Sequence, residues 1–173
     1  MTRVLQLRPG RFLDPLQGDL VDCHFLEDGS SIPYTALSYV WGDPAEKCAV
    51  FVNGNPMAVP ANLGRALRQI RSEHTTVAIW ADAICINQAD IIERASQVAI
   101  MLDIYSAAAR VFAWLGPETE HTAVGMQVLK QLLKENLGSG PASWESLPAN
   151  ILRPGIADVT ERQYFQRMWV SSY

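Results

Sequence analysis

Carboxylate and amide side chains follow directly after an apolar segment in the middle of the chain. Residues 77–80 are rich in β-branched and aromatic types, as in a buried strand, and the polar residues after them include Asp82, Asn87 and Gln88. Open α/β sheets bind ligands at the carboxyl ends of their strands. The position of these side chains therefore predicts a binding site.

A second apolar segment, residues 34–41, ends in a similar way. It contains Ser38 and Trp41, and Asp43 follows after a glycine. Gly-Asp favours a tight turn, which is an adequate structural explanation for Asp43. If the two segments are neighbouring strands, their ends open into one cleft. The indole would then stack on a nucleotide base, and the aspartates would hold ribose hydroxyls.

Glu93 has two interpretations of about equal standing. Asp90-Ile-Ile-Glu93 fits a capping box, in which the glutamate returns to the backbone N–H of the N-cap residue. Alternatively, Glu93 is a catalytic carboxylate in the predicted cleft. Arg94 beside it either pairs with Asp82 or Asp90, or binds a phosphate group bidentately.

Other reactive groups have no suitable neighbours in the sequence. There is no glycine-rich phosphate loop, no Gly-x-Ser-x-Gly elbow and no His-x-x-x-His pair, and the histidines (His24, His74, His121) stand apart. Cys85 follows a buried strand, where a free cysteine usually packs as a small apolar side chain. We therefore predict no metal site and a structural role for Cys85.

Short strands are predicted before residue 62, namely residues 4–7, 20–25, 34–41, 48–52 and 55–59. The last two form a hairpin, because Asn53-Gly54 supplies the positive φ angles of a type I′ turn. Asn62 is then predicted to cap a helix whose buried stripe is Leu63, Ala66, Leu67 and Ile70. The opposite side, with Arg65, Arg68 and Arg71, is predicted to be solvated.

Apolar segments then alternate with a helical pattern. A stripe that begins after Asp90 places five residues on one buried helix face: Ile91, Ala95, Val98, Leu102 and Tyr105. The strand, helix and strand order calls for a right-handed crossover and parallel strands. We expect an α/β fold with a mostly parallel central sheet of residues 34–41, 77–81 and 111–115, flanked by helices. The N-terminal strands and the hairpin should add antiparallel pairs at an edge.

The C-terminal part predicts a helix over residues 123–136, a long loop over 138–158 and a last helix over 160–169. Phe165 and Trp169 should point from that last helix into the core. A length of 173 residues suggests one domain. The net charge of −4 argues against nucleic-acid binding. Three scattered cysteines and no apolar run of membrane-spanning length indicate a soluble, cytoplasmic protein.

Several sequence blocks, in the right order, resemble the fungal heterokaryon-incompatibility (HET) domain. They are Tyr34-Thr-Ala-Leu-Ser-Tyr-Val-Trp-Gly-Asp43, Asn62-Leu63, Ala66-Leu67, Trp80-Ala-Asp82, Cys85-Ile-Asn-Gln88, Glu93-Arg94, Gln97-Val98, Met101, Ile104-Tyr105, Ala108 and Trp114-Leu-Gly116. The resemblance is best over residues 3–116 of a domain spanning 1–173, and recurs over 162–170. There Gln163 and Tyr164 replace the usual Pro and Trp, and the chain stops at Tyr173 where Gln-Glu would follow. This departure suggests either a truncated chain or a dispensable last acidic residue.

The resemblance implies a role in fungal non-self recognition, innate immunity and regulated cell death. HET domains are also distantly similar to Toll/interleukin-receptor (TIR) domains, which implies a TIR/flavodoxin-like fold. Many TIR enzymes cleave the nicotinamide–ribose bond of NAD with one glutamate. This implies Glu93 as the catalytic residue, with Glu118 and Glu120 as alternates. The implied NAD-binding residues are Ser38, Tyr39, Trp41, Asp43, Asp82, Asn87, Gln88 and Arg94. NAD would be the substrate, and no cofactor is required.

The alternative is a non-catalytic module. It would transmit a signal by self-association or by binding another death-effector protein. Trp41 and Trp114 would then anchor the interface.

Overall fold

The computed structural model describes residues 1–27, 29–136 and 149–166 of the chain. The chain divides into two units, Met1–Trp114 and Leu115–Tyr173, and each is described here by itself. The single domain expected from chain length stays a prediction.

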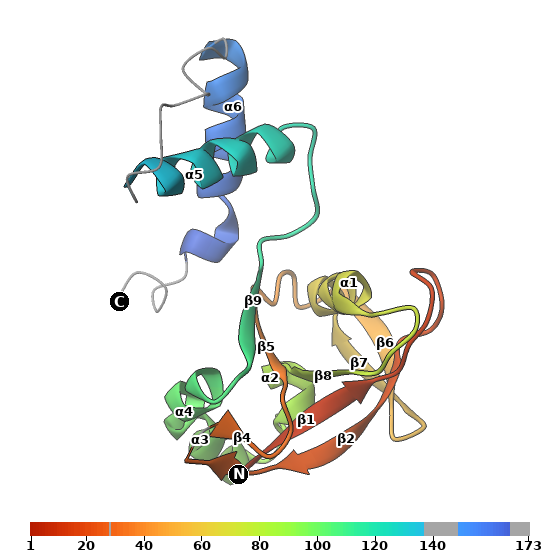
Figure 1. The fold of residues 1–173 in the computed structure, drawn as a ribbon. Helices are drawn as coiled ribbons and strands as arrows, with labels where there is room; N and C mark the ends of the chain where they lie inside the picture. The colour runs from red at the N-terminus through yellow and green to blue at the C-terminus, as the bar shows by residue number, and fades with distance from the viewer. Residues whose placement is uncertain (28, 137–148, 167–173) are drawn as a thin grey trace. The chain divides into compact units, whose positions relative to one another are not determined.

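A seven-stranded sheet forms the centre of the first unit (Figure 1). Its order is β7-β6-β2-β1-β8-β5-β9, and its strands are β1 (Thr2–Leu7), β2 (Gln17–Cys23), β5 (Thr35–Tyr39), β6 (Lys47–Val52), β7 (Asn55–Pro60), β8 (Val77–Trp80) and β9 (Arg110–Trp114). A separate small sheet pairs β3 (Phe25–Leu26) with β4 (Gly29–Ser30).

The predicted parallel group of strands is confirmed. β5 lies between β8 and β9 and runs parallel to both. The sheet as a whole is mixed, because β1 runs antiparallel to β2 and β8, and β6 runs antiparallel to β7. β2 and β6 form a further parallel pair.

The N-terminal strands and the hairpin add two antiparallel pairs on one side of the parallel group, next to β8, as predicted. β1 and β2 occupy the interior of the sheet, and β7 of the hairpin forms one edge. Val4 and Leu5 are adjacent and point to opposite faces, yet both are fully buried. β1 is therefore covered on both faces, as a central strand is. An antiparallel strand at this position departs from a flavodoxin-like sheet, and the TIR/flavodoxin-like assignment stays a prediction.

The hairpin prediction is confirmed. Asn53 and Gly54 have positive φ angles of 51° and 77° between β6 and β7. This conformation matches the twist of the two flanking strands.

Helices cover both faces of the sheet. On one face, Tyr39 pairs in register with Trp114, whose indole N–H donates a hydrogen bond to Asn62 of α1 (Ala61–Ile70). Ala36 points to the opposite face and pairs with Trp80, whose ring packs edge-on against Tyr105 of α4 (Met101–Ser106). The short helix α2 (Asp82–Cys85) and α3 (Ile91–Ala99) precede α4 in the chain.

Asn62 is not the N-cap of α1, contrary to the prediction. The helix begins after Pro60, and no side chain caps it. Pro60 is the N-cap residue and Ala61 the first helical residue, so Asn62 lies in the first turn of α1. Leu63, Ala66 and Leu67 are buried as predicted.

The predicted face of α3 and α4 points outward. Asp90 caps α3 as expected, since its Oδ1 accepts from the backbone N–H groups of Ile92 and Glu93. However, much of the apolar stripe is exposed, including Ile91, Val98 and Leu102.

Contacts to β1 explain this orientation. The Thr2 hydroxyl donates to Oε1 of Gln97 at 2.7 Å, and Arg3 forms an ion pair with Glu93. These polar contacts turn Glu93 and Gln97 inward. On α4, Ile104 is buried and its carbonyl accepts a hydrogen bond from Tyr34.

The arginines of α1 also differ from the prediction. Arg65 is exposed, as expected, and its Nη2 lies 3.4 Å from Oε2 of Glu46. Arg68 and Arg71 instead donate to backbone carbonyl oxygens of the β1–β2 loop, and Arg71 is buried.

The second unit contains α5 (Thr122–Asn136), α6 (Ala149–Thr160) and a 3₁₀ turn at Gln163–Gln166. The predicted loop over 138–158 is wrong for residues 149–158, which are helical. Gly125 and Gly155 let the two helices approach, because a Cβ added at Gly125 would lie 2.0 Å from the Gly155 carbonyl oxygen. Phe165 is exposed rather than in a core. Trp169 lies outside the described residues.

Arg162 joins the two ends of the second unit. Its guanidinium donates to the carbonyl oxygens of Leu115, Gly116 and Pro117. It also forms an ion pair with Asp158 at 2.8 Å, which lowers the pKa of that carboxyl to about 2. The C-terminal motif thus begins with a residue that fixes the chain just after β9.

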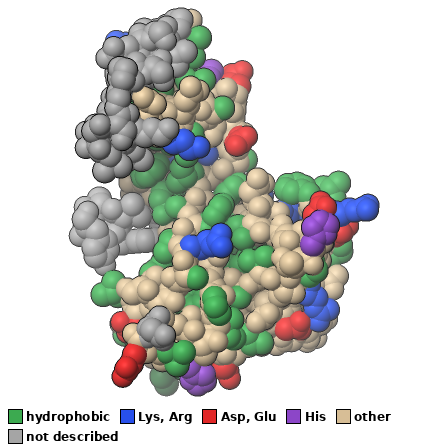
Figure 2. All heavy atoms as spheres, in the orientation of Figure 1, with side chains coloured by type: hydrophobic (Ala, Val, Ile, Leu, Met, Phe, Trp, Pro, Cys, Tyr) green, Lys and Arg blue, Asp and Glu red, His purple; other side chains and the backbone are tan. Residues whose placement is uncertain are grey.

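None of the helices in the described part of the chain combines the length and the apolar character that a membrane-spanning segment requires. On the face seen in Figure 2, acidic and basic side chains are interspersed with apolar ones. This mixture agrees with the small net charge of −4.

Candidate functional site

The carboxyl ends of β5 and β8 carry a hydrogen-bonded cluster around Asp82. The Tyr39 hydroxyl donates to Oδ1 of Asp82 at 2.8 Å, and the indole Nε1 of Trp41 donates to Oδ2 at 3.0 Å. Because β5 and β8 are parallel neighbours, the chain leaves both strands at the same edge of the sheet. Trp41 and Asp82 therefore come together at this edge, as expected.

Asp82 is also fixed by its own segment. Its Oδ1 accepts from the backbone N–H of Ala83 at 2.8 Å, and its carbonyl oxygen accepts from Nε2 of Gln88 at 2.8 Å. A carboxylate accepts about four hydrogen bonds, so the three donors leave room for roughly one more. One ligand hydroxyl fits this remaining capacity.

Electrostatics keep the Tyr39 hydroxyl of the cluster protonated. Burial and the neighbouring Asp82 carboxylate raise the pKa of Tyr39 far above its ordinary value, so its hydroxyl remains a donor. Trp41 is 40% exposed while its indole N–H is held by Asp82. A fixed and partly exposed indole is suited to stack on a flat ring.

A second cross-link, which the sequence did not predict, lies beside this cluster. Nδ2 of Asn62 donates to the carbonyl oxygen of Val40 at 2.7 Å, and its Oδ1 accepts from Nε1 of Trp114 at 2.9 Å. Asn62 thereby ties α1 to the segment after β5 and to the end of β9. Trp114 is fixed from inside the unit, and the prediction that it anchors an interface is not tested.

Glu93 lies in a structural network. Its Oε1 accepts from Arg3 and, at 2.9 Å, from the backbone N–H of Asn87, so it does not return to Asp90 as a capping box requires. Nε of Arg3 also donates to the carbonyl oxygen of Cys85 at 3.1 Å. Arg3 is not among the predicted site residues, because no local pattern links residues this far apart in the sequence. Glu93 thus joins β1 to the loop before α3.

The other predicted site residues do not join the Asp82 cluster. Ser38 is buried within β5. The carboxylate of Asp43 accepts from the backbone N–H of Ala45, and the amide oxygen of Asn87 accepts from that of Ala89, so both support their own turns.

Arg94 is exposed and forms no ion pair with residues 1–27, 29–136 or 149–166. Its predicted pairing with Asp82 or Asp90 is therefore not found there. Of the eight predicted binding residues, the structure joins Tyr39, Trp41, Asp82 and Gln88.

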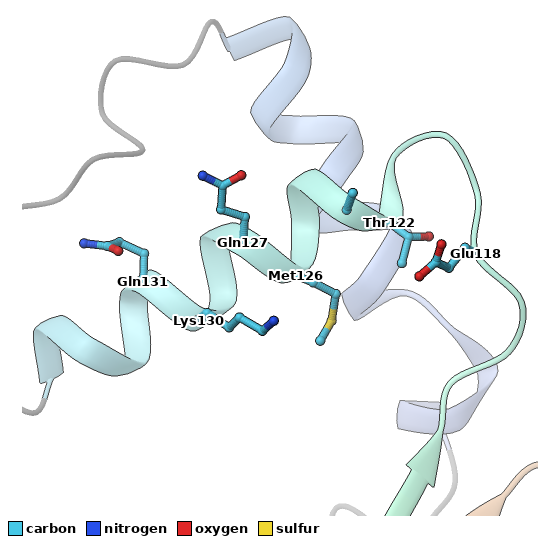
Figure 3. A pocket seen from close by; sticks show the side chains of 7 residues that line it. Glu118, Thr122, Met126, Gln127, Lys130 and Gln131 are labelled. Atoms are coloured by element: carbon cyan, nitrogen blue, oxygen red, sulfur yellow. The ribbon is translucent and has the colours of Figure 1, made fainter. Parts of the chain in front are cut away.

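The alternate glutamates lie in the second unit. Glu118 lines a surface pocket of about 600 Å³ along α5, with Thr122, Met126, Gln127 and Lys130 among its neighbours (Figure 3). In Figure 3, the side chains of Met126 and Lys130 extend to one side of α5 and those of Gln127 and Gln131 to the other. These polar groups do not converge on one point.

Glu120 is exposed, and its Oε1 lies 3.5 Å from Nε2 of His121. This contact is an ion pair only when the histidine is protonated. It does not place the carboxylate in a pocket.

Cys85 has the environment expected of a structural thiol. It is buried, and this burial raises its pKa to about 12, which disfavours the reactive thiolate. No group of three potential metal ligands comes together in the part of the chain that the structure describes.

The comparisons with known proteins agree on one family. The family "Heterokaryon incompatibility protein (HET)" matches residues 34–172. The chain is similar to "Heterokaryon incompatibility protein 6, OR allele" of Neurospora crassa, with 34% identity over 149 residues. These cover 78% of this chain and 22% of the relative, so the chain spans about a fifth of that protein's length. No solved structure matches the chain. Because the family match covers most of the sequence, this chain belongs to the HET family.

Proposed function

We propose that this chain is a signalling domain of fungal non-self recognition and that it acts by protein–protein association. Its similarity to a heterokaryon incompatibility protein supports the biological role. Regulated cell death is the outcome that such a role implies. The mode of action is inferred from the surface of the first unit.

The observation that carries this proposal is the exposed apolar face of α3 and α4. Ile91, Ile92, Val98 and Leu102 are all more than half exposed. A helix normally buries its apolar stripe against its own core. Here the polar contacts to β1 occupy the inward side, and the apolar side is offered to a partner.

NAD cleavage is the second candidate function, and the Asp82 cluster favours it. A held indole beside a carboxylate, at the carboxyl edge of parallel strands, suits a nucleotide. Cleavage also needs a carboxylate near the developing oxocarbenium ion. Glu93, the first choice, is already paired with Arg3, whereas Glu118 and Glu120 are surface residues of the second unit.

One experiment separates the two functions. The chain and its Glu93→Gln and Ile92→Glu variants would be expressed in a filamentous fungus, and growth arrest would be scored. The purified proteins would be incubated with NAD, and nicotinamide release followed by chromatography. An association module should lose growth arrest with Ile92→Glu, keep it with Glu93→Gln, and release no nicotinamide.

Nicotinamide release that disappears in Glu93→Gln would contradict the association proposal and assign catalysis to Glu93. Release that persists in this variant would direct the assignment to Glu118 or Glu120.

A further inference from the structure

The loop between β1 and β2 carries two adjoining exposed apolar side chains near its middle, Phe12 and Leu13, which we call the tip. Phe12 is 56% exposed and Leu13 is 86% exposed. Single exposed apolar residues are ordinary on protein surfaces. The tip differs from such single residues because arginine side chains hold the backbone that carries it.

Two arginines from the end of α1 hold the loop. Nη1 of Arg68 donates to the carbonyl oxygens of Phe12 at 2.7 Å and Asp14 at 2.8 Å. Arg71 donates to three carbonyl oxygens of the loop, those of Arg11, Asp14 and Pro15. A guanidinium is a rigid fork of donors, so these bonds fix the backbone on both sides of the tip.

This arrangement is unfavourable for Arg71 itself. The side chain is buried, burial lowers its pKa, and its Nε has no hydrogen-bond partner among the described residues. A buried charge with an unpaired donor reduces stability. In exchange for this loss of stability, the tip is preorganised. A preorganised tip would lose little conformational entropy on binding a partner.

The same unit carries a second exposed apolar surface, the α3–α4 face, formed by Ile91, Ile92, Val98 and Leu102. β1 separates the two surfaces. Thr2 and Arg3, at its start, contact α3, and the tip follows its last residue, Leu7. Six residues of strand span roughly 20 Å. In Figure 1, the β1–β2 loop and α3 accordingly lie beyond opposite ends of β1.

Charged residues beside the two surfaces are also complementary. The basic Arg11 precedes the tip, and the acidic Asp103 follows Leu102 of the face. The carboxylate of Asp14, behind the tip, is occupied by the backbone N–H of Arg11 at 2.8 Å. Arg94, three residues after Ile91 and four before Val98, is exposed beside the other end of the face, so the opposite charge lies at the Leu102 end alone.

We propose that the tip of one copy of this chain docks on the α3–α4 face of the next copy. The proposal rests on the proposed function as an association module and specifies its partner and interface. When each copy uses its tip on one neighbour and its face on another, the contact is heterologous. Such a head-to-tail contact extends into an open assembly unless the rotation between copies closes a ring.

Sedimentation velocity of the whole chain over a range of concentrations tests this interface. Wild type should form assemblies that grow with concentration. Leu13→Glu and Ile92→Glu alter highly exposed side chains, so both variants should fold, with unchanged circular dichroism melting. Each should weaken self-association by at least about tenfold, because a charge would enter an apolar contact. Leu26→Glu, at a half-exposed apolar residue elsewhere in the unit, is the matched control and should assemble like wild type.

A mixture of the two variants is the decisive measurement. Leu13→Glu retains an intact face and Ile92→Glu an intact tip, so the mixture should form a one-to-one dimer that grows no further. A Leu13→Glu or Ile92→Glu protein that self-associates as strongly as wild type would overturn this interface while leaving association as the function. Wild type that remains monomeric at every concentration would overturn both.

Discussion

The carboxylate of Asp82 shows how a single side chain can organise the edge of a sheet. It accepts hydrogen bonds from Tyr39 and Trp41, at and just after the end of β5, and from the backbone N–H of Ala83, which follows β8. Each donor would otherwise need water or a new partner. Losing one of these bonds therefore affects the positions of two strand ends at once.

Replacing Asp82 by Asn should destabilise the protein by about 1–3 kcal/mol, because the new amide N–H₂ would face one of the donors and leave it unpaired. Urea unfolding followed by tryptophan fluorescence measures this change. Asp43→Asn is the matched control. Its carboxylate accepts only from Ala45 in an exposed turn, so a loss of less than about 0.5 kcal/mol is expected. Equal losses in the two variants would show that the cluster has no special role.

The buried thiol of Cys85 predicts how stability depends on alkaline pH. Its pKa is about 12 in the folded protein, against an ordinary value of 9.0 for a cysteine thiol. Between these values the unfolded thiol ionises while the folded thiol keeps its proton. The free energy of unfolding should therefore fall as pH rises above 9.0, by up to about 1.4 kcal/mol per pH unit.

Urea unfolding at several pH values tests this dependence. Cys85→Ala should be less stable at neutral pH because of the cavity, but its stability should fall less steeply between pH 9 and the onset of tyrosine ionisation near 10. An unchanged slope in this variant would exclude Cys85 as the source.

At the scale of elements, α3 illustrates what could and could not be predicted from the sequence. The N-cap at Asp90 and the helical period are local properties, and both are found in the structure. The outward face was predicted wrongly, because an apolar stripe was assumed to point to the core. The orientation instead follows from contacts of Gln97 and Glu93 with Thr2 and Arg3, which are distant in the sequence.

The candidate site follows the same division. Trp41 and Asp82 are predictable because each lies at the end of a recognisable strand, and parallel neighbours end at one edge. Asn62 was misassigned as a helix cap, since its bonds to Val40 and Trp114 depend on how three elements pack. Local pattern thus placed the strand ends, while tertiary contacts decided which side chains meet there.

The crossing of α5 and α6 gives a prediction for the second unit. Gly125→Ala should destabilise the helix pair by about 1–3 kcal/mol or more, because its Cβ would overlap the Gly155 carbonyl oxygen and force the helices apart. Circular dichroism melting measures the loss. Gln127→Ala, at an exposed position of the same helix, serves as the control and should melt like wild type. A Gly125→Ala protein as stable as this control would contradict the close crossing.

At the scale of the whole molecule, a buried arginine of the first unit, Arg71, holds an exposed loop rather than an apolar core. Arg68 and Arg71 do not strengthen an apolar core. They fix the loop whose tip faces away from it. Under the proposed tip-to-face association, stability and binding depend on the same side chains, and a change behind the tip should alter binding without altering the contact itself.

Arg71→Gln tests this link, because the shorter side chain loses guanidinium bonds to the loop and leaves Phe12 and Leu13 unchanged. We expect faster hydrogen exchange at Gly10 and Asp14, whose backbone N–H groups bond to Ser72 and Arg11 within the held loop. Self-association should weaken as the loop becomes mobile, since ordering it would then oppose binding. The matched control is Arg65→Gln, which removes only an exposed contact to Glu46 and should change neither measurement. If exchange accelerates in Arg71→Gln while association stays at the wild-type level, the tip does not depend on preorganisation. If neither hydrogen exchange nor association changes, Arg71 does not hold the loop.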